Sequence, residues 1–258
     1  MATLDQMRDS SWWAASVREA YRFPVLIGWR RALVLVPAAL ILSLAVTGVH
    51  PAGCGLLEAA LLVAAVVVAQ GALWRVAMPG GQGPALEGRL LAANLLTVLF
   101  LTILAALLSF LLLATAYAVA SAGLGFDAGR TATWAPAIAG PRRMVAGGVA
   151  LAGMASWLWA ASRVSLAAAA TAADRRVRMI DTWTATRGRA WAILAGRLIV
   201  AAPALALVVV MLTIAARAPS NLRNGTAAVG TLCVTLLWLP LDTGFVAAAW
   251  TRLAPAAP

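Results

Sequence analysis

The chain has 258 residues, of which 63% are hydrophobic and only 11% are charged. A soluble domain cannot hide so much apolar surface from water, so this composition excludes an ordinary soluble protein and indicates a protein of the lipid bilayer. All 20 basic residues are arginine and nine residues are acidic, which gives a net charge of +11. The arginines lie at the ends of apolar stretches rather than in a separate basic domain. This placement favours anionic phospholipids as partners and excludes a nucleic-acid-binding protein.

The first 30 residues are predicted to form a cytoplasmic or interfacial arm rather than a signal peptide, because they are polar and charged. A helix reaching about Phe23 would place Trp12 and Trp13 on one apolar side, as in helices that lie at headgroup depth. Pro24 is expected to end or turn this helix. A loosely ordered polar arm is the alternative.

Six apolar stretches follow, most of them close to the roughly 20 residues that cross a bilayer as a helix. We therefore expect an all-α polytopic membrane protein, one domain over residues 1–258, with six transmembrane helices after an N-terminal interfacial helix. The third stretch is longer than a bilayer requires, so it must tilt, kink or protrude. Polar turns are expected at 78–88 and 217–225. The predicted spans are 31–49, 55–77, 90–124, 144–170, 191–216 and 226–252.

The distribution of arginine predicts which side of the membrane each segment faces. With the N-terminus inside, five arginines fall in outer segments and all the others in inner segments or in spans. Because inner loops of membrane proteins are enriched in arginine, we expect both termini to be cytoplasmic. The outer five are Arg130, Arg142, Arg143, Arg217 and Arg223.

Residues 172–191, which we call the Arg-rich connector, separate the fourth and fifth predicted spans. We expect this segment to lie along the cytoplasmic membrane surface, with Trp183 and Trp191 fixing its depth and Gly188 relaxing the backbone before the next span. Its arginines are predicted to bind lipid headgroups or another membrane or cytoplasmic protein. They are Arg175, Arg176, Arg178, Arg187 and Arg189.

Four ionisable residues fall inside the predicted spans: Glu58, Arg163, Arg197 and Asp242. A charge at the centre of a transmembrane helix costs about 2.5 to 3.5 kcal/mol on insertion scales, so such groups pair inside the bundle. Counting residues from the inner ends places the last three at related depths, and we expect Asp242 to pair with Arg163 or Arg197. The pair is either a relay for protons or substrate or a clamp joining spans four, five and six. We favour the clamp.

No residue set typical of catalysis or of a metal site stands out, so we expect a non-enzymatic protein without a cofactor. The two cysteines, Cys54 and Cys233, lie in no metal-ligand spacing, and His50 is the one histidine. Both cysteines would lie towards the outer side, so a disulfide is one option and independent packing the favoured one. Gln70 and Asn94 are expected to form hydrogen bonds between helices.

The end of the fourth span and the connector resemble a known pattern. Residues 165–174 (SLAAAATAAD) and 181–191 (DTWTATRGRAW) are similar to the membrane domain of bacterial glycerophosphoryl diester phosphodiesterases, in which a span of small residues leads into an "SW-x-x-TRG-x-x-W" run. Thr182-Trp183 and Thr186-Arg187-Gly188 keep the core of that run, whereas Asp174 replaces the usual Pro-Glu. The resemblance covers about a tenth of the chain. It implies a six-span protein of the bacterial inner membrane, without the phosphodiesterase domain.

Three functions remain open, in order of preference. The first is a non-enzymatic membrane protein that binds lipids or acts as a scaffold or accessory subunit for a partner at its Arg-rich cytoplasmic face. The second is the permease subunit of an ABC-type exporter, in which the segment 172–189 would contact an ATP-binding subunit. The third is an intramembrane enzyme acting on lipid headgroups, which would need a cluster of polar side chains around an inner cavity.

Overall fold

The computed structural model describes residues 12–28, 35–47, 55–78, 85–123, 127–130, 138 and 140–254. All regular structure within these ranges is α-helical, in agreement with the predicted all-α class. The helices are α2 (Trp12–Ile27), α4 (Leu35–Thr47), α5 (Gly55–Ala77), α6 (Leu86–Ser121), α8 (Pro141–Val164), α9 (Ala167–Asp174), α10 (Met179–Ala185), α11 (Ala190–Arg217) and α12 (Ser220–Leu253).

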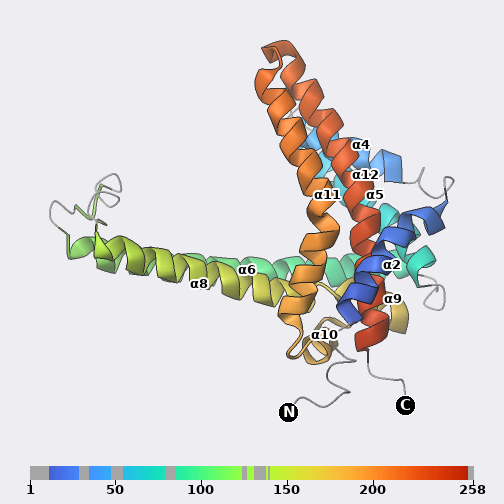
Figure 1. Cartoon of the computed structure of the whole chain (residues 1–258), viewed down its shortest axis with the longest axis horizontal. Coiled ribbons are helices and arrows are strands. Elements are labelled where there is room, and N and C mark those ends of the chain that lie inside the picture. Colours follow the sequence, from blue (N-terminus) through green and yellow to red (C-terminus); the bar gives the residue numbers. More distant parts are fainter. Residues whose placement is uncertain are drawn as a thin grey trace.

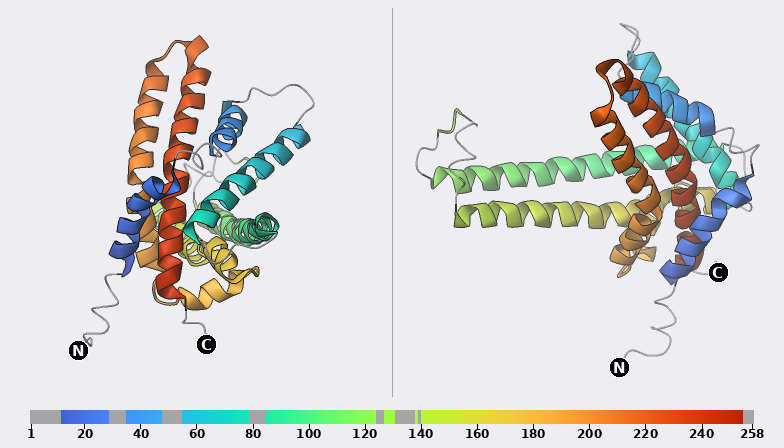
Figure 2. Two further views of the ribbon diagram at one scale, coloured as in Figure 1. Left: turned by 90° about the vertical axis from the view of Figure 1, so that its right-hand side faces the viewer. Right: turned by 45° about the horizontal axis from the view of Figure 1, so that its top comes forward.

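Two long helical hairpins project in different directions from one shared region (Figure 1). Helices α6 and α8 lie side by side in the first hairpin, and α11 and α12 in the second (Figure 2). Helices α2, α9 and α10 gather where the two hairpins meet, and α4 and α5 lie beside α12. We call this meeting region the junction.

The main hydrophobic core lies in the junction. It is formed by α2, the end of α5, the start of α6, α9, the start of α11 and the second half of α12. Leu90, Leu166, Ile193 and Phe245 are fully buried there. The two hairpins therefore pack together at the junction and diverge from each other away from it.

The hairpins expose apolar side chains along most of their length. Among the residues that the structure describes, four helical segments are long and apolar enough to cross a membrane: Leu86–Ser121, Pro141–Asp174, Ala190–Arg217 and Arg223–Leu253. In their most apolar 18-residue stretches, the buried share is 0%, 6%, 11% and 44%, respectively. Helix α12 is thus the central helix, and the exposed apolar surface of the others suits contact with lipid rather than water. The chain is a helical membrane protein.

Helix α2 continues past Pro24, so the prediction that this proline ends or turns the helix was wrong. The buried residues of α2 recur at helical spacing through Phe23 and Ile27. Burial of these two side chains offsets the backbone hydrogen bond that a proline inside a helix loses. The helix ends at Gly28, whose φ of 72° is the left-handed conformation that glycine adopts at low cost.

The predicted fourth span, 144–170, falls within the candidate membrane-spanning segment Pro141–Asp174, and α8 gives way to α9 inside it at Ser165–Leu166. A predicted boundary was wrong at the connection between α11 and α12. The polar turn expected at 217–225 is reduced to Ala218 and Pro219, because α12 begins at Ser220 and includes the polar residues that follow. Pro219 suits this start because a proline cannot continue α11 but readily precedes a helix.

Candidate functional site

The Arg-rich connector joins the two hairpins at the junction. It is not a single interfacial segment but comprises the end of α9, a turn, the short helix α10 and a second turn into α11. The backbone reverses at Arg175 and Gly188, whose φ angles are 55° and 74°. Only the second of these is glycine, so the first reversal carries a small conformational cost. The result is that α10 folds back onto α8, α9 and α6.

The buried guanidinium of Arg163 lies where α10 meets α8. Only 7% of Arg163 is exposed. Its Cζ atom lies 4.9 Å from the ring centroid of Trp159 and 4.2 Å from that of Trp183. The two rings meet edge to face at 5.2 Å, and Phe100 of α6 contacts Trp183 in the same manner at 6.2 Å. We call Arg163, Trp159, Trp183 and Thr186 the arginine cage.

Hydrogen bonds complete the cage. Arg163 Nη2 donates to the carbonyl oxygen of Trp183, and its Nε donates to Oγ1 of Thr186 at 3.3 Å. The Thr186 hydroxyl in turn donates to the Thr182 carbonyl at 2.7 Å. Both threonines are fully buried. Contacts with aromatic ring faces and hydrogen bonds to a carbonyl and a hydroxyl therefore offset the hydration that the Arg163 guanidinium loses on burial.

Asp242 pairs with Arg197 and not with Arg163. Arg197 Nε lies 2.7 Å from one carboxylate oxygen of Asp242, and Nη2 lies 2.8 Å from the other. This two-point geometry is the strongest that an arginine and a carboxylate form. The pair links α11 to α12 but does not include α8, which contributes Arg163 to a separate site. The predicted clamp would have joined spans four, five and six. In the structure the ion pair joins only α11 and α12.

A glycine brings those two helices close enough for the pair to form. A Cβ on Gly196 would lie only 2.5 Å from the ring of Phe245. The bare backbone therefore lets the fully buried Phe245 ring of α12 pack directly against α11. Gly196 precedes Arg197 in the chain, so the close approach and the ion pair occupy the same turn of α11.

The five predicted arginines of the connector have different surroundings. Arg178 lies between two carboxylates, 3.1 Å from that of Asp174 and 3.3 Å from that of Asp181. Arg176 and Arg187 are exposed and have no carboxylate partner among the residues that the structure describes. Arg175 is exposed and its carbonyl accepts a hydrogen bond from Arg89, whereas Arg189 is half-buried at the start of α11. Five arginines against two aspartates leave this surface positively charged.

Apolar side chains are exposed on the same connector. Ile180 is 83% exposed and Trp191 is 55% exposed, and Val177 is exposed beside them. Water would disfavour such side chains on a soluble surface, whereas the headgroup region accepts arginine, tryptophan and aliphatic groups together. The composition of this surface is therefore typical of a segment at a membrane interface.

The other residues named in the sequence analysis lie outside the arginine cage and the Arg197–Asp242 pair. Asn94 donates a hydrogen bond to Gln70, which joins α6 to α5. Cys233 is a free, half-buried thiol. Cys54, His50 and the side chain of Glu58 lie outside the described residues, so the favoured independent packing of the two cysteines and the alternative disulfide both stay untested. The described part of the chain holds no group of three or more histidine, cysteine or acidic side chains that could bind a metal ion.

The arginine cage was missed by sequence reasoning, although its signals were present. Trp159 precedes Arg163 by four residues, which places both on one face of a helix. Thr182, Trp183 and Thr186 also belong to the motif that carried the family resemblance, in which Trp183 was expected to fix the depth of the connector at the membrane surface. In the structure Trp183 and Thr186 instead contact Arg163, and the Thr182 carbonyl accepts a hydrogen bond from Thr186. No family model, curated protein or solved structure matches this chain.

Proposed function

We propose that this chain is a non-enzymatic polytopic protein of a bacterial inner membrane that binds anionic phospholipids at the cytoplasmic side of its junction. In this proposal α4 and α5 are the first two of six spans, and both termini are cytoplasmic. The chain would be a relative of the phosphodiesterase membrane domain that its connector resembles.

The exposed connector carries the proposal. Arg176 and Arg187 present guanidinium groups without carboxylate partners in the described structure, and the same connector exposes the side chains of Ile180 and Trp191. Each arginine near an anionic leaflet contributes about 1 kcal/mol of attraction, and the apolar side chains add burial in the headgroup region. Both terms favour the same orientation of the junction against a membrane surface.

Two features support the assignment of α4 and α5 as spans. Helix α5 has 23 residues, which at 1.5 Å per residue is enough to cross the hydrocarbon core. Helix α4 packs along the central helix α12 and against α5. A six-span arrangement also leaves the connector and the end of α12 on the same side of the membrane as α2.

Lipid binding by the purified full-length chain tests the proposal. After incubation with mixed micelles of phosphatidylglycerol and phosphatidylcholine, native mass spectrometry should show preferential retention of phosphatidylglycerol. Replacing Arg176 and Arg187 with Gln should reduce that preference about 30-fold, since two guanidinium contacts worth about 1 kcal/mol each are lost. Replacing Arg142 and Arg143, which are exposed at the far end of the first hairpin, should leave the preference unchanged. Equal loss in both double variants would contradict the proposal.

Sidedness requires a separate measurement. A single cysteine at the exposed Thr184 should react with an impermeant maleimide only from the cytoplasmic side, and one at the exposed Ala128 only from the outside. Labelling of Thr184→Cys in intact cells from the outside would overturn the proposed orientation.

One observation favours a second candidate, the permease subunit of an ABC-type exporter. Helix α10 is a short helix between two long apolar segments, and it exposes Ile180 at the junction. Such a helix can dock into an ATP-binding subunit. Co-purification of the chain with an ATP-binding protein, lost on Ile180→Glu, would favour this function over lipid binding alone.

A further inference from the structure

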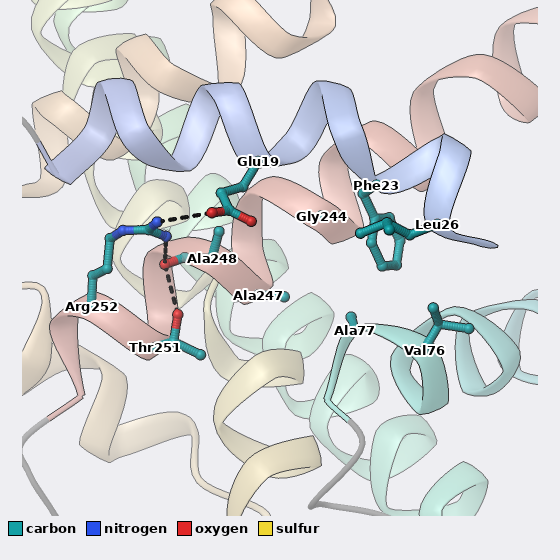
Figure 3. Close-up of a pocket in the computed structure, with 10 residues that line it drawn as sticks. All are labelled: Glu19, Phe23, Leu26, Val76, Ala77, Gly244, Ala247, Ala248, Thr251 and Arg252. Carbon is teal, nitrogen blue, oxygen red and sulfur yellow. Dashed lines mark hydrogen bonds and ion pairs between the residues drawn. The ribbon is translucent and has the colours of Figure 1, made fainter.

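A cavity of about 680 Å³ opens in the junction between α2, the end of α5 and the last turns of α12 (Figure 3). This volume lies within the range of small-molecule binding pockets. Its interior is mainly apolar and its opening is polar. The apolar lining consists of Phe23, Leu26, Val76, Ala77 and Ala247.

One wall of the cavity is held rigidly by direct helix packing. A Cβ on Gly244 would lie 2.6 Å from the Cβ of Phe23, so α2 rests directly on the backbone of α12 at this point. Phe23 is buried and Ala247 is only 5% exposed. This wall of the cavity is therefore part of the packed junction.

The polar opening places a cation next to an anion. Arg252 Nη2 lies 3.4 Å from Oε1 of Glu19, and Arg252 Nη1 donates to the Ala248 carbonyl at 2.9 Å (Figure 3). The Glu19 side chain is 50% exposed and that of Arg252 is 30% exposed. This pair is longer than the Arg197–Asp242 pair at 2.7 Å. Both groups retain hydrogen-bonding capacity, since a guanidinium has five donors and a carboxylate about four acceptor sites.

We propose that this cavity binds one phospholipid with a primary-amine headgroup, of the phosphatidylethanolamine class. Part of an acyl chain would occupy the apolar interior, the phosphate would lie against Arg252, and the ammonium would donate to Glu19. A phosphate and an ammonium on adjacent carbons match a cation and an anion that lie side by side. A glycerol headgroup would supply no cation for Glu19, and a choline headgroup has no N–H to donate.

The inference rests on the proposed placement of the junction at a membrane surface, but it involves a different site from the connector. Helices α2, α5 and α12 form the cavity, whereas the anionic-lipid surface comprises α10 and the turns beside it. Glu19 also makes the cavity less suited to phosphatidylglycerol, because that lipid carries the same phosphate but no ammonium to balance the carboxylate. The two sites therefore select different lipids.

Two variants, Glu19→Gln and Arg252→Gln, test the cavity in the full-length protein, purified in mild detergent and incubated with phosphatidylethanolamine and phosphatidylcholine of identical acyl chains. Native mass spectrometry should show that the unmodified chain retains the ethanolamine lipid about tenfold better. Glu19→Gln should abolish that preference while leaving retention of the choline lipid unchanged. Arg252→Gln should lower retention of both lipids, since both carry the phosphate.

Controls separate this result from a structural effect and from the connector. Asp127→Asn, which alters an exposed carboxylate near the far end of the first hairpin, should retain the preference. The Arg176→Gln/Arg187→Gln variant should lose phosphatidylglycerol but keep the ethanolamine preference, so failure at one site is distinguishable from failure at the other. Equal retention of the two lipids by the unmodified chain would overturn the inference. So would matching losses in Glu19→Gln and Arg252→Gln with matching drops in melting temperature.

Discussion

The arginine cage and the Arg197–Asp242 pair each accommodate an arginine among apolar helices, but with different partners. Arg163 lies near the end of α8 and is buried, and Arg197 lies near the start of α11 with 28% of its side chain exposed. Arg197 is paired with a carboxylate, whereas Arg163 is enclosed by aromatic faces, a carbonyl and a hydroxyl. The pair is neutral overall, but the cage retains a net positive charge.

This difference indicates different roles for the two arginines. The ion pair joins two neighbouring long helices, so it fixes the register between α11 and α12. The cage joins the end of one hairpin to the connector, so it fixes α10 on the junction and determines which connector residues are exposed. A lipid-binding surface on the connector therefore depends on the cage more than on the ion pair.

The largest effect is expected from Arg163→Ala. This change loses cation–π contacts worth about 2 kcal/mol when desolvated, and it leaves polar groups without a donor at a cost of about 1 to 3 kcal/mol. The free energy of unfolding, measured by titration with SDS in mixed micelles, should fall by about 3 to 4 kcal/mol. Arg163→Lys should recover less than half, because an ammonium lacks the planar donor array. Arg142→Ala, at the exposed start of α8, is the matched control.

Asp242→Ala should be next in size, because it leaves Arg197 without its carboxylate. Breaking a fully buried pair costs about 3 to 5 kcal/mol, and the remaining exposure here reduces the expected loss to about 2 to 3 kcal/mol. Adding Arg197→Leu should restore part of the stability, since no unpaired charge remains. A double-mutant cycle in the same SDS assay measures this coupling. If the double variant is no more stable than Asp242→Ala, the clamp interpretation is wrong.

Gly196→Ala tests whether close packing of α11 and α12 positions the ion pair. The added methyl group would meet the Phe245 ring, and overpacking of this kind costs about 1 to 3 kcal/mol. Gly153→Ala in α8, where a Cβ would meet nothing within 4 Å, should instead be neutral or stabilising by up to about 1 kcal/mol. Thermal unfolding of both variants distinguishes the two sites. Similar melting temperatures would show that the close approach has no energetic importance.

Arg178→Ala should have the smallest effect, although Arg178 has two carboxylates within 4 Å. The side chains of all three partners are more than a third exposed, and exposed ion pairs contribute about 0 to 1 kcal/mol. Any loss should diminish in 0.5 M salt, because exposed charges are screened. Suppose instead that the loss in free energy of unfolding does not depend on salt and is as large as that expected for Arg163→Ala. The number of ionic partners, rather than burial, would then determine how much an arginine contributes to stability here.

Local patterns predicted much of the fold. Apolar runs indicated the long helices α6, α8, α11 and α12 because a transmembrane helix is recognised by composition and length alone. The same patterns failed at Pro24, where burial of neighbouring side chains outweighs a local preference. They also gave no sign of the change from α8 to α9 at Ser165–Leu166, because the composition stays apolar there.

The amino-acid sequence by itself determined that this protein is helical, that it belongs in a membrane and that Asp242 needs a cationic partner. These properties depend on whether a segment is better solvated by water or by lipid, and the composition of the segment alone determines that. Only the tertiary structure decided that the partner is Arg197 and that Trp159, Trp183 and Thr186 surround Arg163. The physical reason is that hydropathy indicates how deep a residue lies but not which way its helix is turned. Partners far apart in the chain meet only when packing, as at Gly196 against Phe245, has set that rotation.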